Sequence, residues 1–177
     1  MKTLPDYLRE DLDILSIGLN PSINSVRAGF YFATPQNRFW KALNASTLVN
    51  EPLVPGRESQ EVLFERYGIG FTDVVKRPSS SGSQLRAVDF RKWIPVLQEI
   101  LTRYHPRIAW FHGKVAYRAF AKYALHSNED LPWGLQCQTV GDTQIFVTPN
   151  PSPANAAFSL HDLIESYNQL SLVSRGG

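Results

Sequence analysis

The sequence predicts an α/β fold, a three-layer α/β/α sandwich whose central, mostly parallel sheet has four or five strands. Two observations predict this fold. Short apolar runs of strand length alternate along the chain with longer segments of helical periodicity. Strand–helix–strand units cross over with a right hand, which places helices on both faces of a parallel sheet. The length of 177 residues and a hydrophobic content of 43% suit one core of this size, so we expect a single domain over residues 1–177.

Four short apolar runs are the expected core strands. The first, at 12–17, reads LDILSI and is followed by Gly18. The other three lie at 69–75, 107–111 and 144–148. Residues 135–140 are expected to pair antiparallel with the last of these strands through the turn at Gly141 and Asp142.

Five segments between and after these runs have the apolar spacing of helices: 37–44, 59–67, 89–104, 114–125 and 159–172. Ser159 is the expected N-cap of the last one. No internal repeat or long linker interrupts the alternation, and only the stretch 79–83, SSSGS, has the composition of a flexible loop. The order of the elements therefore supports the layered fold.

Composition narrows the class of protein. No apolar run approaches the roughly 20 residues that span a bilayer, so we expect no membrane association. Cys137 is the only cysteine, which excludes an intramolecular disulfide and cysteine-rich metal sites, and the histidines lack metal-ligand spacing. We therefore expect a monomer in the reducing cytoplasm, with no metal and no cofactor.

The formal net charge of +2 conceals an uneven distribution. Residues 24–118 hold fourteen Lys and Arg against seven Asp and Glu. Twelve of the eighteen basic residues are Arg, whose planar guanidinium suits phosphate oxygens. The basic middle of the chain slightly favours a nucleic-acid partner, although proteins that never meet DNA carry excesses of this size as well.

Ligands of open α/β sheets bind beyond the carboxyl ends of the strands, so the loops that follow the strands carry the candidate site. The first loop begins GLNPS at 18–22, a tight turn that presents the Asn20 amide and backbone N–H groups at the sheet edge. After the fourth core strand, Asn150 and Ser152 stand in a second rigid loop, PNPSP at 149–153. Each loop also has a plain structural reading, an Asx-turn in the first and an ordinary connection into the last helix in the second.

Four segments resemble the motifs of the mismatch-specific uracil and thymine DNA glycosylases. They read GLNPS at 18–22, GFYFATPQNRFW at 29–40, GFTDVVKRP at 70–78 and NPSPANAAFS at 150–159. The resemblance runs in order from about residue 12 to the last helix. It implies the α/β sandwich that the alternation predicts. It also implies an enzyme that extrudes a uracil or a damaged pyrimidine from DNA and cleaves its glycosidic bond without metal or cofactor.

The resemblance implies roles for individual residues as well. Asn20 would hold the attacking water beneath the sugar carbon, Phe32 would stack on the extruded base, and Leu19 would meet the base through its backbone. Asn37 would hydrogen-bond the base edge, with a helix N-cap as the alternative. The substrate-binding set is completed by Gly18, Asn150 and Ser152.

Asp73 is a candidate because of its position rather than through the resemblance. It stands at the end of the second core strand, at the same sheet edge as Asn20. A carboxylate there would take the proton that an amide cannot accept, or would stabilise the sugar cation. Many relatives lack an acid at this point. The alternatives are a helix N-cap or a salt bridge with Lys76 or Arg77.

Lys76 and Arg77 are expected to hold DNA phosphates beside the flexible stretch. The segment expected to wedge into the duplex is small where many family members carry a bulky residue and an arginine: Pro153, Ala154, Asn155 and Ala156. A small wedge fills less of the gap left by an extruded base, so recognition of the opposite base should weaken.

Two other functions stay open from sequence alone. The first is a glycosylase for other deaminated or damaged bases, because pocket loops diverge while a fold persists. The second is a non-catalytic module that binds nucleic acid or a nucleotide. Release of a free base separates the first from the second.

Overall fold

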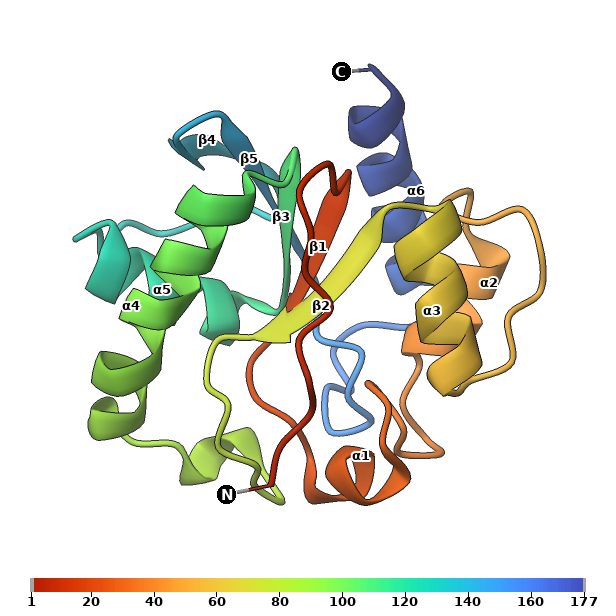
Figure 1. Ribbon diagram of the computed structural model, residues 1–177, viewed down its shortest axis with the longest axis horizontal. Coiled ribbons are helices and arrows are strands. Elements are labelled where there is room, and N and C mark those ends of the chain that lie inside the picture. The colour runs from red at the N-terminus through yellow and green to blue at the C-terminus, as the bar shows by residue number, and fades with distance from the viewer. Residues whose placement is uncertain (1, 177) are drawn as a thin grey trace.

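Five strands form one sheet in the order β2-β1-β3-β5-β4 in the computed structural model, which describes residues 2–176 (Figure 1). The strands are β1 (Ile14–Gly18), β2 (Ile69–Asp73), β3 (Ile108–His112), β4 (Gly134–Val140) and β5 (Thr143–Thr148). β1 pairs parallel with β2 and β3, β3 pairs parallel with β5, and β4 pairs antiparallel with β5. The predicted mostly parallel sheet and its antiparallel hairpin are confirmed; residues 1 and 177 of the expected domain lie outside the described part.

The strand order reverses at β1. The chain passes from β1 outward to β2 and then returns to β3 on the other side of β1. The connections that leave β1 and β3 therefore run in opposite directions along the sheet. Ligands of open sheets bind at such a point, beyond the carboxyl ends of the two strands.

Helices cover both faces of the sheet, as predicted. One face carries α2 (Phe39–Ala45), α3 (Arg57–Arg66) and α6 (Leu160–Gly176), and the other carries α4 (Ala87–Tyr104) and α5 (Lys114–Ala124) (Figure 1). Successive residues of each strand point to opposite faces, so β1 sends Ile14 to the first layer and Leu15 to the second. The fold is the three-layer sandwich. None of the helices within residues 2–176 is both long and apolar enough to cross a bilayer.

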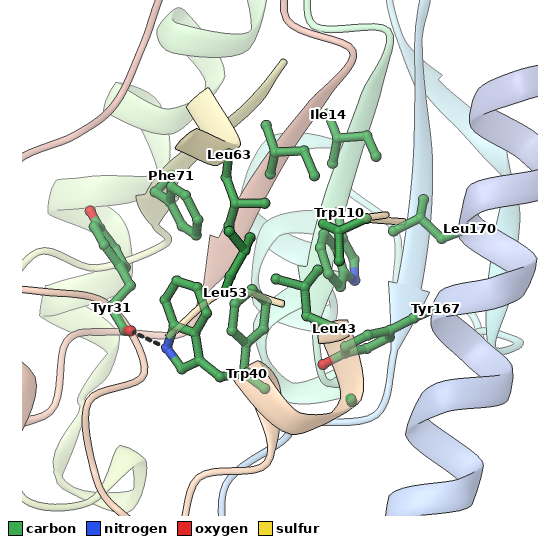
Figure 2. Close-up of a cluster of buried hydrophobic side chains, with 14 of the residues drawn as sticks. Ile14, Tyr31, Trp40, Leu43, Leu53, Leu63, Phe71, Trp110, Tyr167 and Leu170 are labelled. Carbon is green, nitrogen blue, oxygen red and sulfur yellow. Dashed lines mark hydrogen bonds between the residues drawn. The ribbon is translucent and has the colours of Figure 1, made fainter. Parts of the chain in front are cut away.

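Aromatic side chains dominate the core beneath α2, α3 and α6 (Figure 2). Phe71 and Trp110 of the sheet belong to one buried cluster with Trp40 of α2 and Tyr167 of α6. The indole N–H of Trp40 donates to the carbonyl oxygen of Tyr31 at 3.1 Å (Figure 2). This bond satisfies a buried polar atom and ties the chain before α2 to the core.

A short helix that the sequence does not predict lies beyond the carboxyl ends of the strands. α1 (Ile23–Ala28) begins after Ser22, whose hydroxyl accepts the Ser25 N–H at 3.0 Å, and it ends at Gly29 in the left-handed region. Six residues are too few to show an apolar period. α1 lies at the end of the molecule toward which β1 points (Figure 1).

The N-terminal segment covers the outer edge of β2. Tyr7 and Phe71 exchange backbone hydrogen bonds, with Tyr7 N–H donating at 2.9 Å and Phe71 N–H donating at 3.2 Å. An uncovered edge strand would offer its free backbone groups to other chains. The same contact brings Asp6 close to the end of β2.

Candidate active site

A cavity of about 1110 Å³ lies beyond the carboxyl ends of the sheet. Both asparagine-bearing loops line it, the first with Gly18, Leu19 and Asn20 and the second with Asn150 and Ser152. The two loops leave strands that are separated by β3 in the sheet. The structure therefore brings the two loops together around one hollow.

The loop after β1 is fixed by backbone hydrogen bonds to the chain after β2. Val74 N–H donates to the Gly18 carbonyl at 2.8 Å, and Ser79 N–H donates to the Pro21 carbonyl at 3.2 Å. The segments that follow β1 and β2 thus remain hydrogen-bonded to each other beyond the ends of the two strands. This pairing holds Asn20 at the sheet edge.

Asn20 uses both of its amide hydrogens within the protein. Its Nδ2 donates to the Arg77 carbonyl at 2.9 Å and to Ser79 Oγ at 2.7 Å. Because a carbonyl oxygen only accepts, the nitrogen of the amide must face Arg77, and this fixes the side-chain orientation. Asn20 lines the cavity and is partly exposed, and its Oδ1 has no donor within residues 2–176. That oxygen is free to accept a hydrogen bond from water.

Residues 79–83, which their composition predicts to be flexible, make defined contacts beside Asn20. Ser79 is buried, and its hydroxyl donates to the Ser81 carbonyl at 2.8 Å while it accepts from Asn20. A short 3₁₀ helix (Gly82–Gln84) follows. The segment therefore supports the first loop.

Asp73 ends β2 and lines the cavity, although only 5% of it is exposed. It is the register partner of Gly18 on β1. A Cβ atom at position 18 would lie 2.8 Å from Asp73 Oδ1. Glycine at this position therefore leaves room for the carboxylate at the site.

A buried ion network holds the Asp73 carboxylate. Lys76 Nζ lies 3.3 Å from Asp73 Oδ2 and donates to Asp6 Oδ1 at 2.8 Å and to Tyr31 Oη at 3.2 Å. Thr72 Oγ1 also donates to Asp6 Oδ1, at 2.8 Å. Asp73 thus forms the salt bridge with Lys76 that the sequence offers as a structural alternative. The same residue also lines the cavity.

Two opposing causes set the pKa of Asp73. Burial raises this pKa to about 6, and the neighbouring Lys76 ammonium limits the rise. Burial alone would lower the pKa of Lys76, but Asp73 and Asp6 together raise it above its ordinary value. At neutral pH Lys76 is therefore charged and Asp73 is mostly ionised, with a basicity suited to accepting a proton.

Phe32 forms an aromatic platform on the cavity wall. Its ring stacks on Phe39 with centroids 4.2 Å apart and planes 18° apart, and it meets His112 edge-on at 5.0 Å. The backbone of Phe32 has φ +58°, in the left-handed region that bulky residues rarely adopt. Such strain persists where the surroundings fix the conformation. One of these restraints is the hydrogen bond from Ala33 N–H to Ser25 Oγ at 3.1 Å.

His112 contributes a neutral imidazole to the same wall. Burial lowers its pKa to about 3. Its Nε2 lies 2.8 Å from Ser16 Oγ, while Nδ1 is buried without a partner in the described part of the chain. Its place directly after the Trp110-Phe111 pair of β3 is the one signal in the sequence that points to this edge.

Asn37 divides its side chain between two roles. Its Oδ1 accepts the Phe39 N–H at 2.9 Å, but the N-cap of α2 is Arg38, so Asn37 lies one residue before the cap position that the sequence leaves as an alternative. Asn37 also lines the cavity, and its Nδ2 has no acceptor among residues 2–176. The oxygen serves the start of α2, and the nitrogen remains available to a ligand.

Arg38 holds the second loop from the inside. Its guanidinium donates to the carbonyl oxygens of Phe158, Ser152 (3.3 Å) and Asn155 (2.9 Å), and its backbone N–H donates to Pro151 O at 3.1 Å. One arginine thus sets the path of the loop between β5 and α6. Arg38 precedes α2 by one residue, and nothing local in the sequence reveals these contacts.

The expected wedge lies only partly on the cavity. Pro153 and Ala154 are exposed and line its mouth. Asn155 also lines it, but its Nδ2 donates to the Asn150 carbonyl at 3.0 Å and so holds the loop together. Ala156 is exposed and does not line the cavity. The part of the loop that faces outward therefore carries short side chains.

The structure places both cations that are expected to hold phosphates, Lys76 and Arg77, in ion pairs with acids of the same chain. Lys76 is buried in the ion network, and Arg77 binds the Asp89 carboxylate through Nε and a terminal nitrogen, both at 2.8 Å. Their charges are already neutralised within the protein. The acid partner of Lys76 in the N-terminal segment, Asp6, is 70 residues away along the chain, so local sequence cannot reveal the pair.

Two other cations stand at the cavity mouth. Arg27 of α1 and Lys114 at the start of α5 both line the cavity, and neither has a salt-bridge partner within residues 2–176. The buried Asp73 is the one acid among the lining residues. Only Gly113 separates Lys114 from the end of β3, so the rule that points to strand ends would have found it.

In the described part of the chain, no three His, Cys, Asp or Glu side chains gather as a metal site. The candidate site consists of the oriented amide of Asn20, the buried carboxylate of Asp73 with its raised pKa, and the aromatic wall that Phe32 forms. Cations stand at its mouth.

Comparison with known proteins identifies the family of the chain. The family model of the uracil DNA glycosylase superfamily matches residues 5–170, which include both loops and every lining residue from Gly18 to Phe158. The fold is similar to a solution NMR structure of a protein assigned as a uracil DNA glycosylase from Methanosarcina acetivorans. The TM-score is 0.62 and the identity 23%, over 96% of this chain and 98% of that chain. The chain belongs to the uracil DNA glycosylase superfamily, and it is a DNA glycosylase.

Proposed function

We propose that this enzyme is a monofunctional, mismatch-type uracil DNA glycosylase of base excision repair. It extrudes uracil from DNA, above all opposite guanine, and hydrolyses the N-glycosidic bond with a water molecule held by Asn20. The observation that carries the proposal is one cavity lined by Asn20, whose Oδ1 accepts no hydrogen bond from residues 2–176, by the buried Asp73 and by Phe32. No step requires a metal or a cofactor.

Binding begins with extrusion, because a base inside the duplex hides its sugar carbon. Extrusion costs a few kcal/mol, and the cost is smaller for a mismatched base. Phe32 offers an aromatic face to the extruded base, and such stacking contributes roughly 1 to 3 kcal/mol per base. The free Nδ2 of Asn37 donates to a carbonyl oxygen at the base edge.

Asn20 and Asp73 then act on the water. Asn20 Oδ1 accepts one hydrogen of the water and directs its oxygen at the sugar carbon. As the carbon–nitrogen bond breaks, its electron pair goes to the base, and the sugar becomes positively charged. The water oxygen bonds to the sugar carbon, and Asp73 takes the proton released. Until then the carboxylate also stabilises the sugar cation.

The short side chains of the loop at 153–156 set the substrate range. Pro153 and Ala154 fill little of the gap in the duplex, so contact with the opposite base contributes little. We therefore expect uracil release opposite guanine, opposite adenine and from single strands. Thymine opposite guanine is the slower substrate, because its methyl group must fit beside the pocket wall.

Initial rates on four labelled oligonucleotides test the proposal: uracil opposite guanine, uracil opposite adenine, uracil in a single strand, and thymine opposite guanine. The rates are compared for wild type, Asn20→Ala and Asp73→Asn. Uracil release by wild type that falls in both variants supports the proposed reaction. If no strand yields free uracil, the proposal is wrong, and a panel of other deaminated bases then identifies the substrate.

A further inference from the structure

An exposed aromatic corner lies at the cavity mouth, and the reaction steps above do not use it. This mouth corner consists of Lys114, Trp133 and Phe158, which all line the cavity. The rings of Trp133 and Phe158 meet edge-to-face, with centroids 5.1 Å apart and planes 75° apart. Lys114 Nζ lies 4.6 Å from the centroid of the Trp133 ring. Three segments distant in sequence thus form one surface.

Trp133 is presented by a braced turn rather than by a loose loop. The side chain of Gln136, itself buried, donates through Nε2 to the carbonyls of Pro132 (2.8 Å) and Gly134 (2.9 Å), the residues on either side of Trp133. Gly134 adopts φ +84°, which a residue with a side chain rarely tolerates. The turn therefore holds the indole outward at a fixed position.

The exposure of Trp133 sets it apart from the other tryptophans. It is 39% exposed, whereas Trp40 and Trp110 are buried in the core and Trp93 is partly buried. Val115, which follows Lys114 in the chain and lines the same cavity, is exposed as well. A large apolar ring at the mouth of a substrate cavity, with an unneutralised ammonium over it, has the features of a surface that receives a flat, anionic partner.

DNA with one nucleotide extruded presents a flat base next to a negatively charged phosphate. Removal of one base from the stack leaves one face of its neighbour on the same strand without a stacking partner. The short side chains of Pro153 and Ala154 cannot replace that partner, although they face the mouth. Phe158 ends the same loop and joins it to Trp133.

We propose that the mouth corner binds the strand that carries the extruded nucleotide, with Trp133 stacking on the adjacent unpaired base and Lys114 pairing with its phosphate. The inference rests on the proposed extrusion of the nucleotide. The corner supplies the stacking that the small loop lacks. It matters most for single-stranded DNA, because in a duplex the neighbouring base remains paired and stacked.

Fluorescence anisotropy with an uncleavable strand tests this surface. The probe is a short labelled single strand with one deoxyuridine fluorinated at the sugar carbon beside the glycosidic bond, where fluorine destabilises the cationic sugar. Trp133→Ala is expected to weaken binding of this probe about tenfold. A matched duplex should lose less. Trp133→Phe should retain most of the affinity.

The contribution of Lys114 is measured separately through salt dependence. Lys114→Ala should reduce the slope of log Kd against log salt concentration by about 0.7, the value for one phosphate contact on a single strand. Lys92→Ala is the matched control, since Lys92 lies 5.0 Å from the Trp93 ring in a similar pair that does not line the cavity. Its slope should stay at the wild-type value.

Direct contact with Trp133 also has a spectroscopic readout. Stacking should quench the fluorescence of wild type when the single strand binds, and Trp133→Phe should lose most of that quenching. This measurement and the Lys114 slope decide the question if Trp133→Ala fails to fold.

The outcomes separate this inference from the proposed reaction. Unchanged affinity in Trp133→Ala, unchanged quenching in Trp133→Phe or an unchanged slope in Lys114→Ala would overturn the surface, whatever the rate of uracil release. Weaker binding by Trp133→Ala, less quenching in Trp133→Phe and a smaller slope in Lys114→Ala, in an enzyme that releases no uracil, would support the surface and refute the reaction.

Discussion

The two walls of the cavity differ in charge and in the way they are held. On the β2 side, Asp73 and Lys76 form a buried ion pair that a distant residue, Asp6, completes. On the β3 side, Phe32 and the neutral His112 form an aromatic wall without charge. In the proposed reaction the charged wall accepts the proton and the aromatic wall holds the flat base, because a buried carboxylate needs a fixed counter-charge whereas stacking needs none.

Asn20 lines the same cavity as the two walls. Its amide nitrogen is anchored to the chain after β2, and its oxygen is left for the ligand. The nitrogen of the amide is hydrogen-bonded to the charged wall. Its oxygen accepts no hydrogen bond from residues 2–176, and the residue lines the cavity. Each experiment below removes one wall or the link between them.

The largest effect is expected from removal of the link. Asn20→Ala deletes the acceptor that positions the water, and the rate of uracil release under single-turnover conditions should fall by about 10³-fold, the upper end for loss of one positioned polar group. Affinity for the uncleavable single strand should change little, because the stacking wall is intact. A rate within a factor of a few of wild type would separate Asn20 from the chemistry.

Removal of the aromatic wall should have the opposite signature. Phe32→Ala deletes the ring on which the base stacks, and the Kd for the uncleavable strand should rise about tenfold to a hundredfold. Phe32→Tyr keeps an aromatic face at the same strained backbone position and serves as the control. Equal affinity in wild type and Phe32→Ala would show that the base lies elsewhere.

The smallest effect concerns the counter-charge of the ionic wall. Lys76 lowers the pKa of Asp73 against the rise caused by burial. Its replacement in Lys76→Met should raise that pKa, so the acid limb of the pH–rate profile should move to higher pH by about one unit or more. Lys76→Arg keeps the charge and should keep the limb near its wild-type position. A shift toward lower pH would contradict the assignment of the ion pair.

The fold and the meeting of the two loops follow from the sequence for a physical reason. Parallel strands bring their carboxyl ends to one edge, so Asn20 and Asn150 share a neighbourhood once their strands are recognised. Local patterns also give Asp73 its place at the end of β2. These inferences need only the order of the strands, which apolar runs reveal.

The electrostatic identity of the site could not be predicted in the same way. From sequence alone Lys76 is expected to be an exposed cation. In the fold it is buried and pairs with Asp6, which is 70 residues away along the chain. Arg38 likewise finds its carbonyl partners more than a hundred residues away, at Ser152, Asn155 and Phe158. Burial and long-range pairing decide the charge of such groups, and neither has a local sequence signal.

The most direct test of the central claim is the pH dependence of single-turnover uracil release by wild type and Asp73→Asn. A base acts only when ionised, so the wild-type rate should fall as the pH drops below the Asp73 pKa of about 6. Asp73→Asn should be slower by about 10²-fold and should show no acid limb near that pH. An unchanged acid limb in Asp73→Asn, or a wild-type rate that does not fall near pH 6, would contradict the account.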